Sequence, residues 1–346
     1  MKIIYYANFG DFKNRSNLEA LKRAGANVLE ISSERVATDI LKEEIRFKPD
    51  VVLFSTSNKY VTFVELTQVS KKIKALKVAH GADPMEDWET DDWRWHFLPI
   101  QFFQKLRLKI PFIRLQRLLN RLIIFDVGLN RLDWFIPFAR ELDILFLTDG
   151  SFHASRYGIK HFYDLKQSCD PKLHFPVPFD QRYASDIAFI GSIYTTGRRE
   201  LIQKVRQTYD FKMYGFGRDL DGRPLKQVFG EEFSKVCNSA KIILGDNAIN
   251  NRPDYWSNKV YLTLGCGGFF LTPYAPGLEK YFNNKEHLVW YQTTDEALDL
   301  IEYYLSHSEE RKLIADNGYK LVHKYHTSDN RMKELLEKIK LYLPHD

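Results

Sequence analysis

Short apolar segments alternate with helix-like segments along most of this 346-residue chain. The segments Lys2–Ala7, Pro49–Ser55 and Leu142–Thr148 carry nearly continuous apolar runs, which suit strands buried on both faces. Strands that alternate with helices indicate βαβ units, because parallel neighbours need a long crossover. The chain is also longer than one hydrophobic core usually serves. We therefore expect an α/β protein made of two doubly wound, Rossmann-like domains.

Proline residues mark the expected boundary between the two domains. Pro171, Pro176 and Pro178 flank an extended segment, and proline disfavours helix both at its own position and at the one before it. We place the first domain at residues 1–172 and the second at 173–327, followed by a last helix within 328–346. The regular alternation breaks at about 85–137, where the chain is rich first in Trp and then in Arg and Lys.

Local signals predict where the early helices begin and end. Ser16–Ala24 reads as a helix with Ser16 as its N-cap and Gly25 at its end. We expect further helices over Arg35–Phe47 and Thr62–Ala75.

Composition indicates the cellular compartment of the protein but does not identify its binding partner. A net charge of +5 is compatible with nucleotides, lipid headgroups or nucleic acid and selects none of them. Three cysteines without CxxC spacing argue for reduced thiols and against a zinc site or a disulfide framework. The first apolar run is too short for a signal peptide, and no apolar stretch is long enough to span a bilayer. We expect a cytoplasmic protein.

Two glycine-containing turns follow strand-like segments in the second half of the chain. Small residues let the backbone approach a phosphate group, and an arginine offers two parallel hydrogen bonds to it. Ordinary structural turns account for the same residues, so that alternative stays open. The candidate ligand residues in these turns are Gly191, Ser192, Arg198, Tyr214, Gly215 and Gly217.

Two further loops of the second half carry polar and charged residues. Ser257 can cap a helix whose N-terminus points at phosphate, and Lys259 adds a full positive charge there. The glycines at the other end of that helix let the next strand start close to it. The candidate residues in these loops are Asn247, Ser257, Asn258, Lys259, Gly267 and Gly268.

The order of these segments over about residues 186–331 resembles the C-terminal half of glycosyltransferases with the two-domain GT-B fold. It is most similar to the "glycosyl transferases group 1" set, which includes spore-maturation-protein-like enzymes. The resemblance implies two domains that face a cleft and a last helix that crosses back to the first domain. It also implies that a sugar moves from a nucleotide-diphosphate sugar, most simply a UDP-sugar, to an acceptor hydroxyl without a cofactor or a metal.

The chain departs from the resembled family at one position that matters for the donor. Lys259 and Gly267 match the family's Arg and Gly, but Leu262 stands where the family has a Glu that usually binds the ribose hydroxyls. Tyr261, Thr263 and Glu279 are the alternatives for that role, and the sequence does not rank them.

The first domain is expected to hold the acceptor. Gly10, Asp11 and Ser57 follow strand-like segments and are candidates for the acceptor side. His80 and Asp83 are candidate catalytic residues, because His and Asp can remove or shuttle a hydroxyl proton near neutral pH. A hydrogen-bonded turn residue is the alternative for both.

The triplet Asp219-Leu220-Asp221 has the pattern that binds metal in the other large glycosyltransferase fold. There it follows a strand directly, whereas here it lies in a polar turn. We therefore expect a turn and no metal site.

A basic stretch over residues 101–125 interleaves Lys and Arg with Phe, Leu and Ile and is interrupted by Pro111. It reads as a helical excursion packed on the first domain, as a pair of helices on an anionic membrane surface, or as a clamp on a polyanionic acceptor. Three functions stay open. The first is an enzyme of surface glycan assembly at the inner membrane face, with a glycan or lipid-linked acceptor. The others are a DNA-modifying sugar transferase of the phage type and a non-catalytic nucleotide- or glycan-binding protein.

Overall fold

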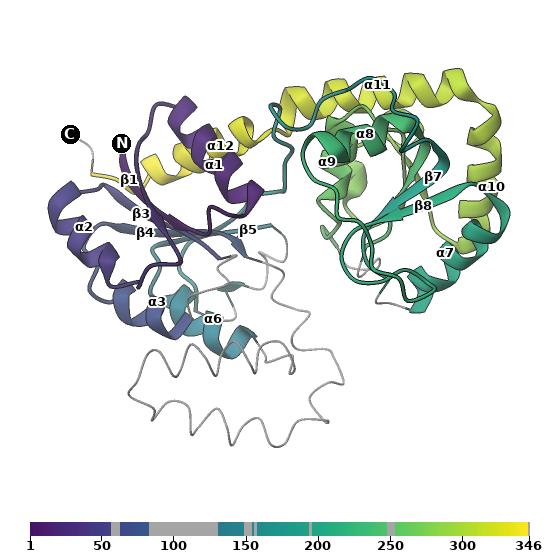
Figure 1. Cartoon of the computed structure of the whole chain (residues 1–346). Coiled ribbons are helices and arrows are strands. Elements are labelled where there is room, and N and C mark those ends of the chain that lie inside the picture. The colour runs from purple at the N-terminus through teal and green to yellow at the C-terminus, as the bar shows by residue number, and fades with distance from the viewer. Residues whose placement is uncertain are drawn as a thin grey trace. The chain divides into compact units, whose positions relative to one another are not determined.

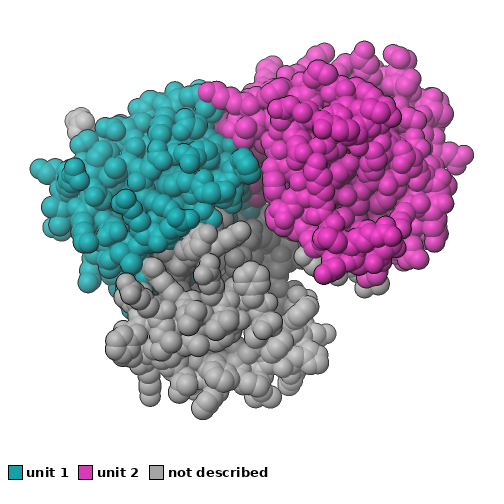
Figure 2. Space-filling view, in the orientation of Figure 1, with its two compact units in different colours: residues 1–166, 332–346 teal, residues 167–331 magenta. Residues whose placement is uncertain are grey.

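The computed structural model describes residues 1–56, 63–82, 131–148, 154–155, 158–193, 196–247 and 253–344, with the backbone alone at 82, 131–134 and 196–198. The chain forms two compact units, coloured separately in Figure 2. Unit 1 comprises Met1–Lys166 and Met332–Asp346, and unit 2 comprises Gln167–Arg331. The proline-rich segment that we expected as a linker belongs to unit 2. It is tied there by hydrogen bonds from the Val177 amide to Asn238 Oδ1 (2.6 Å) and from the Asp180 amide to Ser239 Oγ (2.9 Å).

Unit 1 is built on a parallel sheet whose described strands lie in the order β2-β1-β3-β4-β5-β6. The strands are β1 (Lys2–Ala7), β2 (Asn27–Ser32), β3 (Val51–Ser55), β4 (Leu76–Ala82), β5 (Ile144–Leu147) and β6 (Phe162–Asp164). The helices that cover this sheet are α1 (Phe12–Arg23), α2 (Asp39–Phe47), α3 (Phe63–Ser70), α6 (Arg131–Arg140) and α12 (Ser328–Lys340).

Alternate residues of β1 point to opposite faces of this sheet. Ile3 and Tyr5 pack in one buried cluster with residues of α1 and α12, and Ile4 and Tyr6 pack in another with residues of α2, α3 and α6. Figure 1 shows α1 and α12 on one side of the sheet and α2, α3 and α6 on the other. The last helix begins within unit 2, ends at Lys340 and buries Leu335 and Ile339 in the core of unit 1.

The first helix starts earlier than the sequence suggested. Asp11 accepts a hydrogen bond from the Lys13 amide and caps the helix, while Ser16 is buried inside it, so the prediction of Ser16 as N-cap was wrong. A carboxylate placed one turn earlier satisfies the free amides first, and the helix therefore begins there. Gly25 ends the helix with a φ of +84°, as expected. The helix α2 is shorter than predicted because it begins at Asp39, and α3, described from Phe63 onward, ends at Ser70 rather than at Ala75.

Unit 2 repeats the doubly wound plan. Its described strands are parallel and lie in the order β11-β10-β9-β7-β8. They are β7 (Ser185–Ile190), β8 (Phe211–Tyr214), β9 (Ala240–Leu244), β10 (Phe270–Pro273) and β11 (Val289–Tyr291). The helices are α7 (Thr196–Thr208), α8 (Glu231–Ser239), α9 (Lys259–Gly265), α10 (Thr294–Ser306) and α11 (Ser308–Tyr325).

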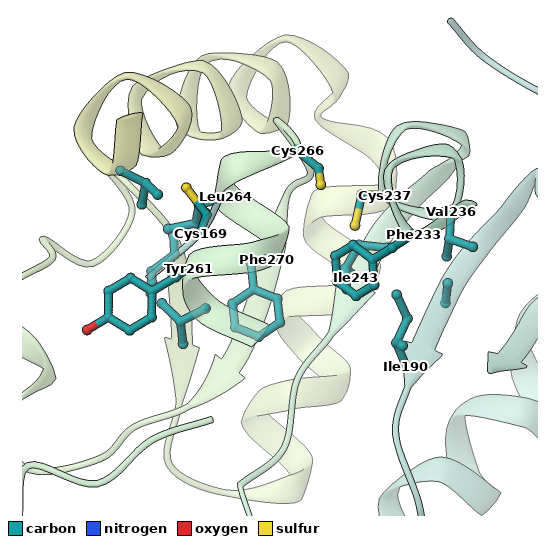
Figure 3. Close-up of a cluster of buried hydrophobic side chains, with 14 of the residues drawn as sticks. Cys169, Ile190, Phe233, Val236, Cys237, Ile243, Tyr261, Leu264, Cys266 and Phe270 are labelled. Carbon is teal, nitrogen blue, oxygen red and sulfur yellow. The ribbon is translucent and has the colours of Figure 1, made fainter. Parts of the chain in front are cut away.

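Two buried clusters cover the faces of this second sheet. One joins the strands to α7 and α10 through residues such as Ile202 and Ile301. The other joins them to α8 and α9 and contains the three cysteines, all of which are free thiols (Figure 3). The α/β class and the doubly wound plan predicted for both parts of the chain are therefore confirmed.

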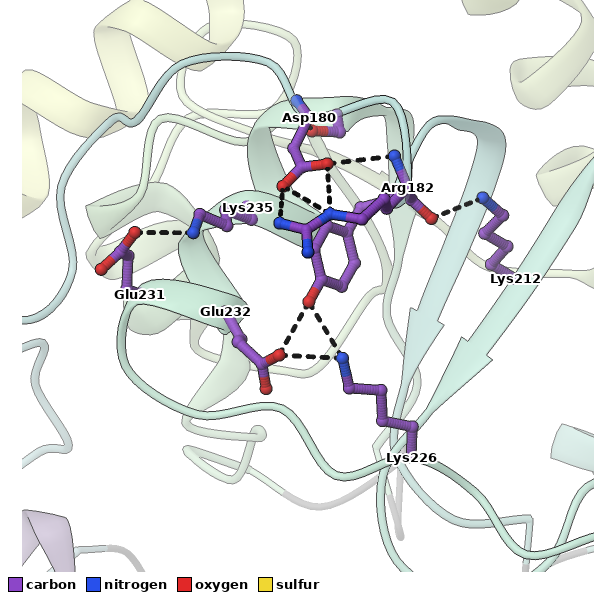
Figure 4. Close-up of polar contacts among 9 residues, drawn as sticks. Asp180, Arg182, Lys212, Lys226, Glu231, Glu232 and Lys235 are labelled. Carbon is purple, nitrogen blue, oxygen red and sulfur yellow. Dashed lines mark hydrogen bonds and ion pairs between the residues drawn. The ribbon is translucent and has the colours of Figure 1, made fainter.

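Ion pairs hold the segment that follows β8 against α8. The Tyr183 hydroxyl donates to Glu232 Oε1 at 2.8 Å, and Lys226 Nζ donates to the same carboxylate oxygen at 2.8 Å (Figure 4). Hydrogen bonds to Glu232 and Tyr183 hold the pKa of Lys226 above its ordinary value. Asp180 and Arg182 form a second pair in the same view, with 2.6 Å between Asp180 Oδ2 and Arg182 Nη2. The contacts of Lys226 fix the loop between β8 and α8 to Tyr183 and to α8.

A buried histidine makes unit 2 sensitive to acid. His326 is packed among the rings of Tyr261, Tyr281 and Phe282, and Arg331 Nη2 donates to its Nδ1 at 2.6 Å. Burial and the neighbouring guanidinium lower the pKa of His326 to about 4. A histidine in the unfolded chain titrates near pH 6.5, so the unfolded state binds more protons between about pH 6.5 and 4. The free energy of unfolding therefore falls as the pH falls through that window.

We expect that lowering the pH from 7 to 5 removes about 2 kcal/mol of stability through His326. In a His326→Gln variant the glutamine still offers Arg331 an acceptor but cannot titrate. The stability difference between wild type and this variant should therefore shrink by that amount between pH 7 and 5. Denaturant unfolding at both values measures it, with His307→Gln, at an exposed position, as the control. Parallel curves for wild type and His326→Gln would contradict the assignment.

Candidate functional site

The two sheets each have a point where the chain switches direction across the sheet. In unit 2 the connection from β7 leads outward to β8, and the later strands continue on the other side from β9. Ligands of open parallel sheets bind at the carboxyl ends of the strands at such a point. The loops that begin at Gly191, after β7, and at Gly245, after β9, therefore define the candidate site of unit 2.

Lys259 places a positive charge at this switch point. A Cβ at Gly191 would lie 2.6 Å from Lys259 Nζ and 2.9 Å from a ring carbon of Phe189, so a larger residue at position 191 would require these side chains to shift. The same ammonium lies 5.4 Å from the centroid of the Phe189 ring. The first residue of α9 thus brings its charge to the carboxyl end of β7, which suits an anionic ligand.

The turn after β8 contacts the turn after β7 through backbone atoms. The Gly191 amide donates to the Tyr214 carbonyl at 2.7 Å, and a Cβ at Gly215 would lie 2.5 Å from the Gly191 carbonyl oxygen. Gly215 and Gly217 have φ values of +134° and +90°. The structure therefore brings together the two glycine turns that the sequence singled out. The Tyr214 side chain is buried in the core and supports this turn from beneath.

Asn247 ties the loop after β9 to the start of α9. Its side-chain oxygen accepts a hydrogen bond from the Ser257 amide at 2.8 Å, and its Nδ2 is buried without a partner among the described residues. Ser257 Oγ in turn accepts from the Lys259 amide at 3.4 Å. Asn258, rather than Ser257, stands at the N-cap of α9 and makes no side-chain capping bond. The buried amide of Asn247 leaves one donor at the switch point for a ligand atom or a water molecule.

Other residues predicted to bind the donor lie elsewhere or are only partly described. Gly267 and Gly268 stand at the far end of α9, where the chain enters β10, and that is the opposite edge of the sheet. A Cβ at Gly268 would lie 3.1 Å from Cys237, so this glycine allows close packing rather than ligand contact. The structure does not bring either glycine to the site. Ser192 follows Gly191 directly, whereas only the backbone of Arg198 is described, in the first turn of α7.

The switch point of unit 1 lies between β1 and β3. Uncharged side chains that hydrogen bond to one another lie there. The Tyr5 hydroxyl donates to Asn14 Oδ1 at 3.2 Å and lies 2.9 Å from His80 Nε2, and Ser55 Oγ donates to Asn14 Oδ1 at 2.8 Å. The sequence analysis named none of Tyr5, Asn14 and Ser55 as site residues. The position of Ser55 at the end of an apolar strand was an available signal, whereas Tyr5 lies within β1 and Asn14 within α1.

His80 is buried within this network. Burial and the charge of Lys13 lower the pKa of His80 to about 3, so the imidazole is neutral at physiological pH. Its contact with Tyr5 gives it a structural role in joining β1 to β4, and the catalytic role predicted for it stays untested. Gly10 and Asp11 lie in the loop after β1, where the Gly10 amide donates to Asn8 Oδ1 at 3.1 Å. Ser57 and Asp83 lie outside the described residues.

The Asp219–Asp221 triplet forms the expected turn. Asp219 Oδ1 accepts from the Asp221 and Arg223 amides, and Arg206 pairs with the Asp221 carboxylate. Hydrogen bonding to Arg206 lowers the pKa of Asp221. In the described ranges no three His, Cys, Asp or Glu side chains converge in a way that could hold a metal ion. Of the helices in those ranges, none combines the length and apolar character needed to cross a bilayer.

Comparison with known proteins defines the class to which this fold belongs. Residues 198–337 match a family model described as "Glycosyl transferase-like". No curated protein sequence matches the chain. The chain resembles the sucrose-phosphate synthase of Thermosynechococcus elongatus with a TM-score of 0.62 at 11% identity, over 99% of both chains. It resembles Anabaena HepE in complex with UDP-glucose with a TM-score of 0.63 at 10% identity, over 99% of this chain and 100% of that one. It also resembles phage T4 BGT in complex with its UDP-glucose substrate with a TM-score of 0.58 at 13% identity, over 100% of both chains.

The chain therefore has the GT-B fold of glycosyltransferases, and the glycosyltransferase-like family model covers residues 198–337 of it. The predicted fold and the wider resemblance are confirmed. The finer likeness to spore-maturation-protein-like enzymes stays a prediction.

The contact between the turns after β7 and β8 can be tested through stability. We expect Gly215→Ala to destabilise the protein by about 3 kcal/mol, because the new methyl group meets backbone atoms at a φ that alanine disfavours. Gly222→Ala is the matched control, since Gly222 also has a positive φ (+82°) but nothing within 4 Å of its Cβ position. The control should cost about 1 kcal/mol. Equal losses in thermal or denaturant unfolding would show that the two turns do not touch.

Proposed function

We propose that this protein is a glycosyltransferase that transfers a sugar from a UDP-sugar to an acceptor hydroxyl. The observation that carries the proposal is the Lys259 ammonium at the switch point of unit 2, where it lies against Gly191. A diphosphate is the anionic part of such a donor, and lysine is a common ligand of phosphate groups in proteins. Anabaena HepE and phage T4 BGT, which share the fold, are structures with bound UDP-glucose, and this supports the choice of donor.

The proposed chemistry needs charge stabilisation on the donor side. The bond between the anomeric carbon of the sugar and the β-phosphate oxygen breaks, and the UDP leaves with the bonding electrons. The acceptor oxygen forms the new bond to the anomeric carbon and loses its proton to a base. The charge that develops on the leaving diphosphate is stabilised by a cation already in place, so that Lys259 contributes most in the transition state. We propose the donor as a substrate and no further cofactor.

The proposal also covers the chemical class of the acceptor. We propose a glycan or lipid-linked hydroxyl in surface glycan assembly in the cytoplasm. Contact with the inner membrane face would come through the basic stretch 101–125, which lies outside the described residues. The neutral, hydrogen-bonded switch point of unit 1 supports an uncharged acceptor group on that side.

We expect Lys259→Ala to weaken UDP binding about ten- to hundredfold. One charge-assisted contact contributes roughly 1.5–3 kcal/mol, which corresponds to that range. Isothermal calorimetry with UDP and UDP-glucose on wild type and variant measures the effect. Lys312→Ala is the control, because this lysine is exposed on α11.

Two outcomes would count against the proposal in different ways. Unchanged affinity in Lys259→Ala would place the nucleotide elsewhere on the chain. A wild-type protein that binds neither UDP nor UDP-glucose, and releases no UDP from UDP-glucose with any acceptor, would contradict the proposed activity.

We also propose Asp83 as the base that removes the acceptor proton. The Asp83→Asn variant should lower turnover by about a hundredfold while leaving UDP affinity unchanged. Release of UDP under saturating donor measures turnover, and calorimetry supplies the binding control. Near-normal turnover in this variant would exclude Asp83 as the base.

A further inference from the structure

The turn after β10 holds a carboxylate in a fixed orientation. Glu279 Oε2 accepts hydrogen bonds from the Tyr274 hydroxyl at 3.1 Å and from the Gly277 amide at 3.0 Å. The residue is exposed, and both of these hydrogen bonds go to Oε2. Two neighbouring residues therefore anchor one oxygen of an exposed carboxylate.

This turn lies against the segment that leads into α9. The Asp254 amide donates to the Pro276 carbonyl at 2.7 Å, and Lys280 Nζ donates to Asp254 Oδ1 at 3.0 Å. A Cβ at Gly277, whose φ is +99°, would lie 2.4 Å from Asp254 Oδ1, so glycine allows the close approach. The rings of Trp256 and Tyr281 lie 5.5 Å apart. Glu279 is thus held beside the segment that ends in Lys259, the cation of the proposed diphosphate site.

Three described residues near Glu279 that could accept a hydrogen bond from a ligand, Tyr261, Thr263 and Asp254, are buried or paired. Tyr261 is fully buried in the cluster of Figure 3 and receives a hydrogen bond from Trp256 Nε1. Thr263 is fully buried as well, and Leu262 packs against the same cluster. The Asp254 carboxylate accepts from Lys280. Among these residues Glu279 is the one with an exposed carboxylate.

The carboxylate is ionised at neutral pH. A hydrogen bond from its own amide, together with those from Tyr274 and Gly277, lowers the pKa of Glu279 below its ordinary value. An ionised carboxylate accepts strong hydrogen bonds from hydroxyl groups, and an acidic residue in this role binds ribose in other doubly wound folds.

We infer that Glu279 binds a vicinal diol of the nucleotide sugar, either that of the ribose or that of the transferred sugar. This inference rests on the proposed function and adds the residue that recognises the uncharged part of the donor. It also names a residue for the role of the ribose-binding Glu of the resembled family, whose position Leu262 occupies in this chain. The carboxylate comes from the turn after β10 and not from α9.

The test compares three probes on two variants by calorimetry. The probes are UDP, 2′-deoxy-UDP and UDP-glucose, and the variants are Glu279→Gln and Glu302→Gln, the latter an exposed glutamate of α10. Glu279→Gln should weaken at least one diol-bearing probe about tenfold or more, and Glu302→Gln should bind all three as wild type does. Circular dichroism and thermal unfolding confirm that both variants are folded.

The pattern across the probes identifies the diol. If Glu279 binds the ribose, UDP and UDP-glucose lose affinity equally, and the preference of wild type for UDP over 2′-deoxy-UDP disappears. If it binds the transferred sugar, only UDP-glucose loses affinity. Wild-type affinities for all three probes in Glu279→Gln would overturn the inference while leaving the proposed donor intact. Failure of wild type to bind any probe would overturn the proposed function, and the inference with it.

Discussion

The candidate donor site depends on a close backbone contact between the ends of β7 and β8. The Gly191 amide bonds to the Tyr214 carbonyl, and neither Gly191 nor Gly215 has room for a side chain. The space left at Gly191 is the one that the Lys259 ammonium borders. If a methyl group stood there, the ammonium and the Phe189 ring would have to shift. The loops after β7 and β8 and the loop before α9 are distant in sequence, and the contacts between them thus depend on Gly191 and Gly215.

The two units share a doubly wound plan but fill their switch points differently. In unit 2 the switch point carries a cation and the buried Nδ2 of Asn247, which has no partner among the described residues. In unit 1 it carries a network of neutral groups around Asn14, with His80 held uncharged by burial. An anionic ligand is favoured in the first environment, and an uncharged hydroxyl group suits the second. A donor site in unit 2 and an acceptor site in unit 1, as proposed, are expected to differ in this way.

Sequence reasoning located most strands and several turns, and its errors have local causes. The alternation of apolar runs predicted β1 within its observed bounds, since a buried strand needs such a run. The start of α1 was misplaced because Asp11 and Ser16 are both good caps, and the choice depends on which amides are free. Gly267 and Gly268 were grouped with Lys259 because they are close in sequence. However, α9 runs from the carboxyl edge of the sheet to its amino edge and separates them.

From the sequence by itself the α/β class, the parallel strands, the glycine turns and the candidate role of Lys259 could be determined, because each depends on residues close together in the chain. The order of the strands depends on pairing between segments far apart, which local patterns do not specify, so only the tertiary structure placed β7 beside β9. The same holds for Glu279. Sequence left it equal to Tyr261 and Thr263, and only packing decided, since it buried those two side chains and left the carboxylate exposed beside the loop before α9.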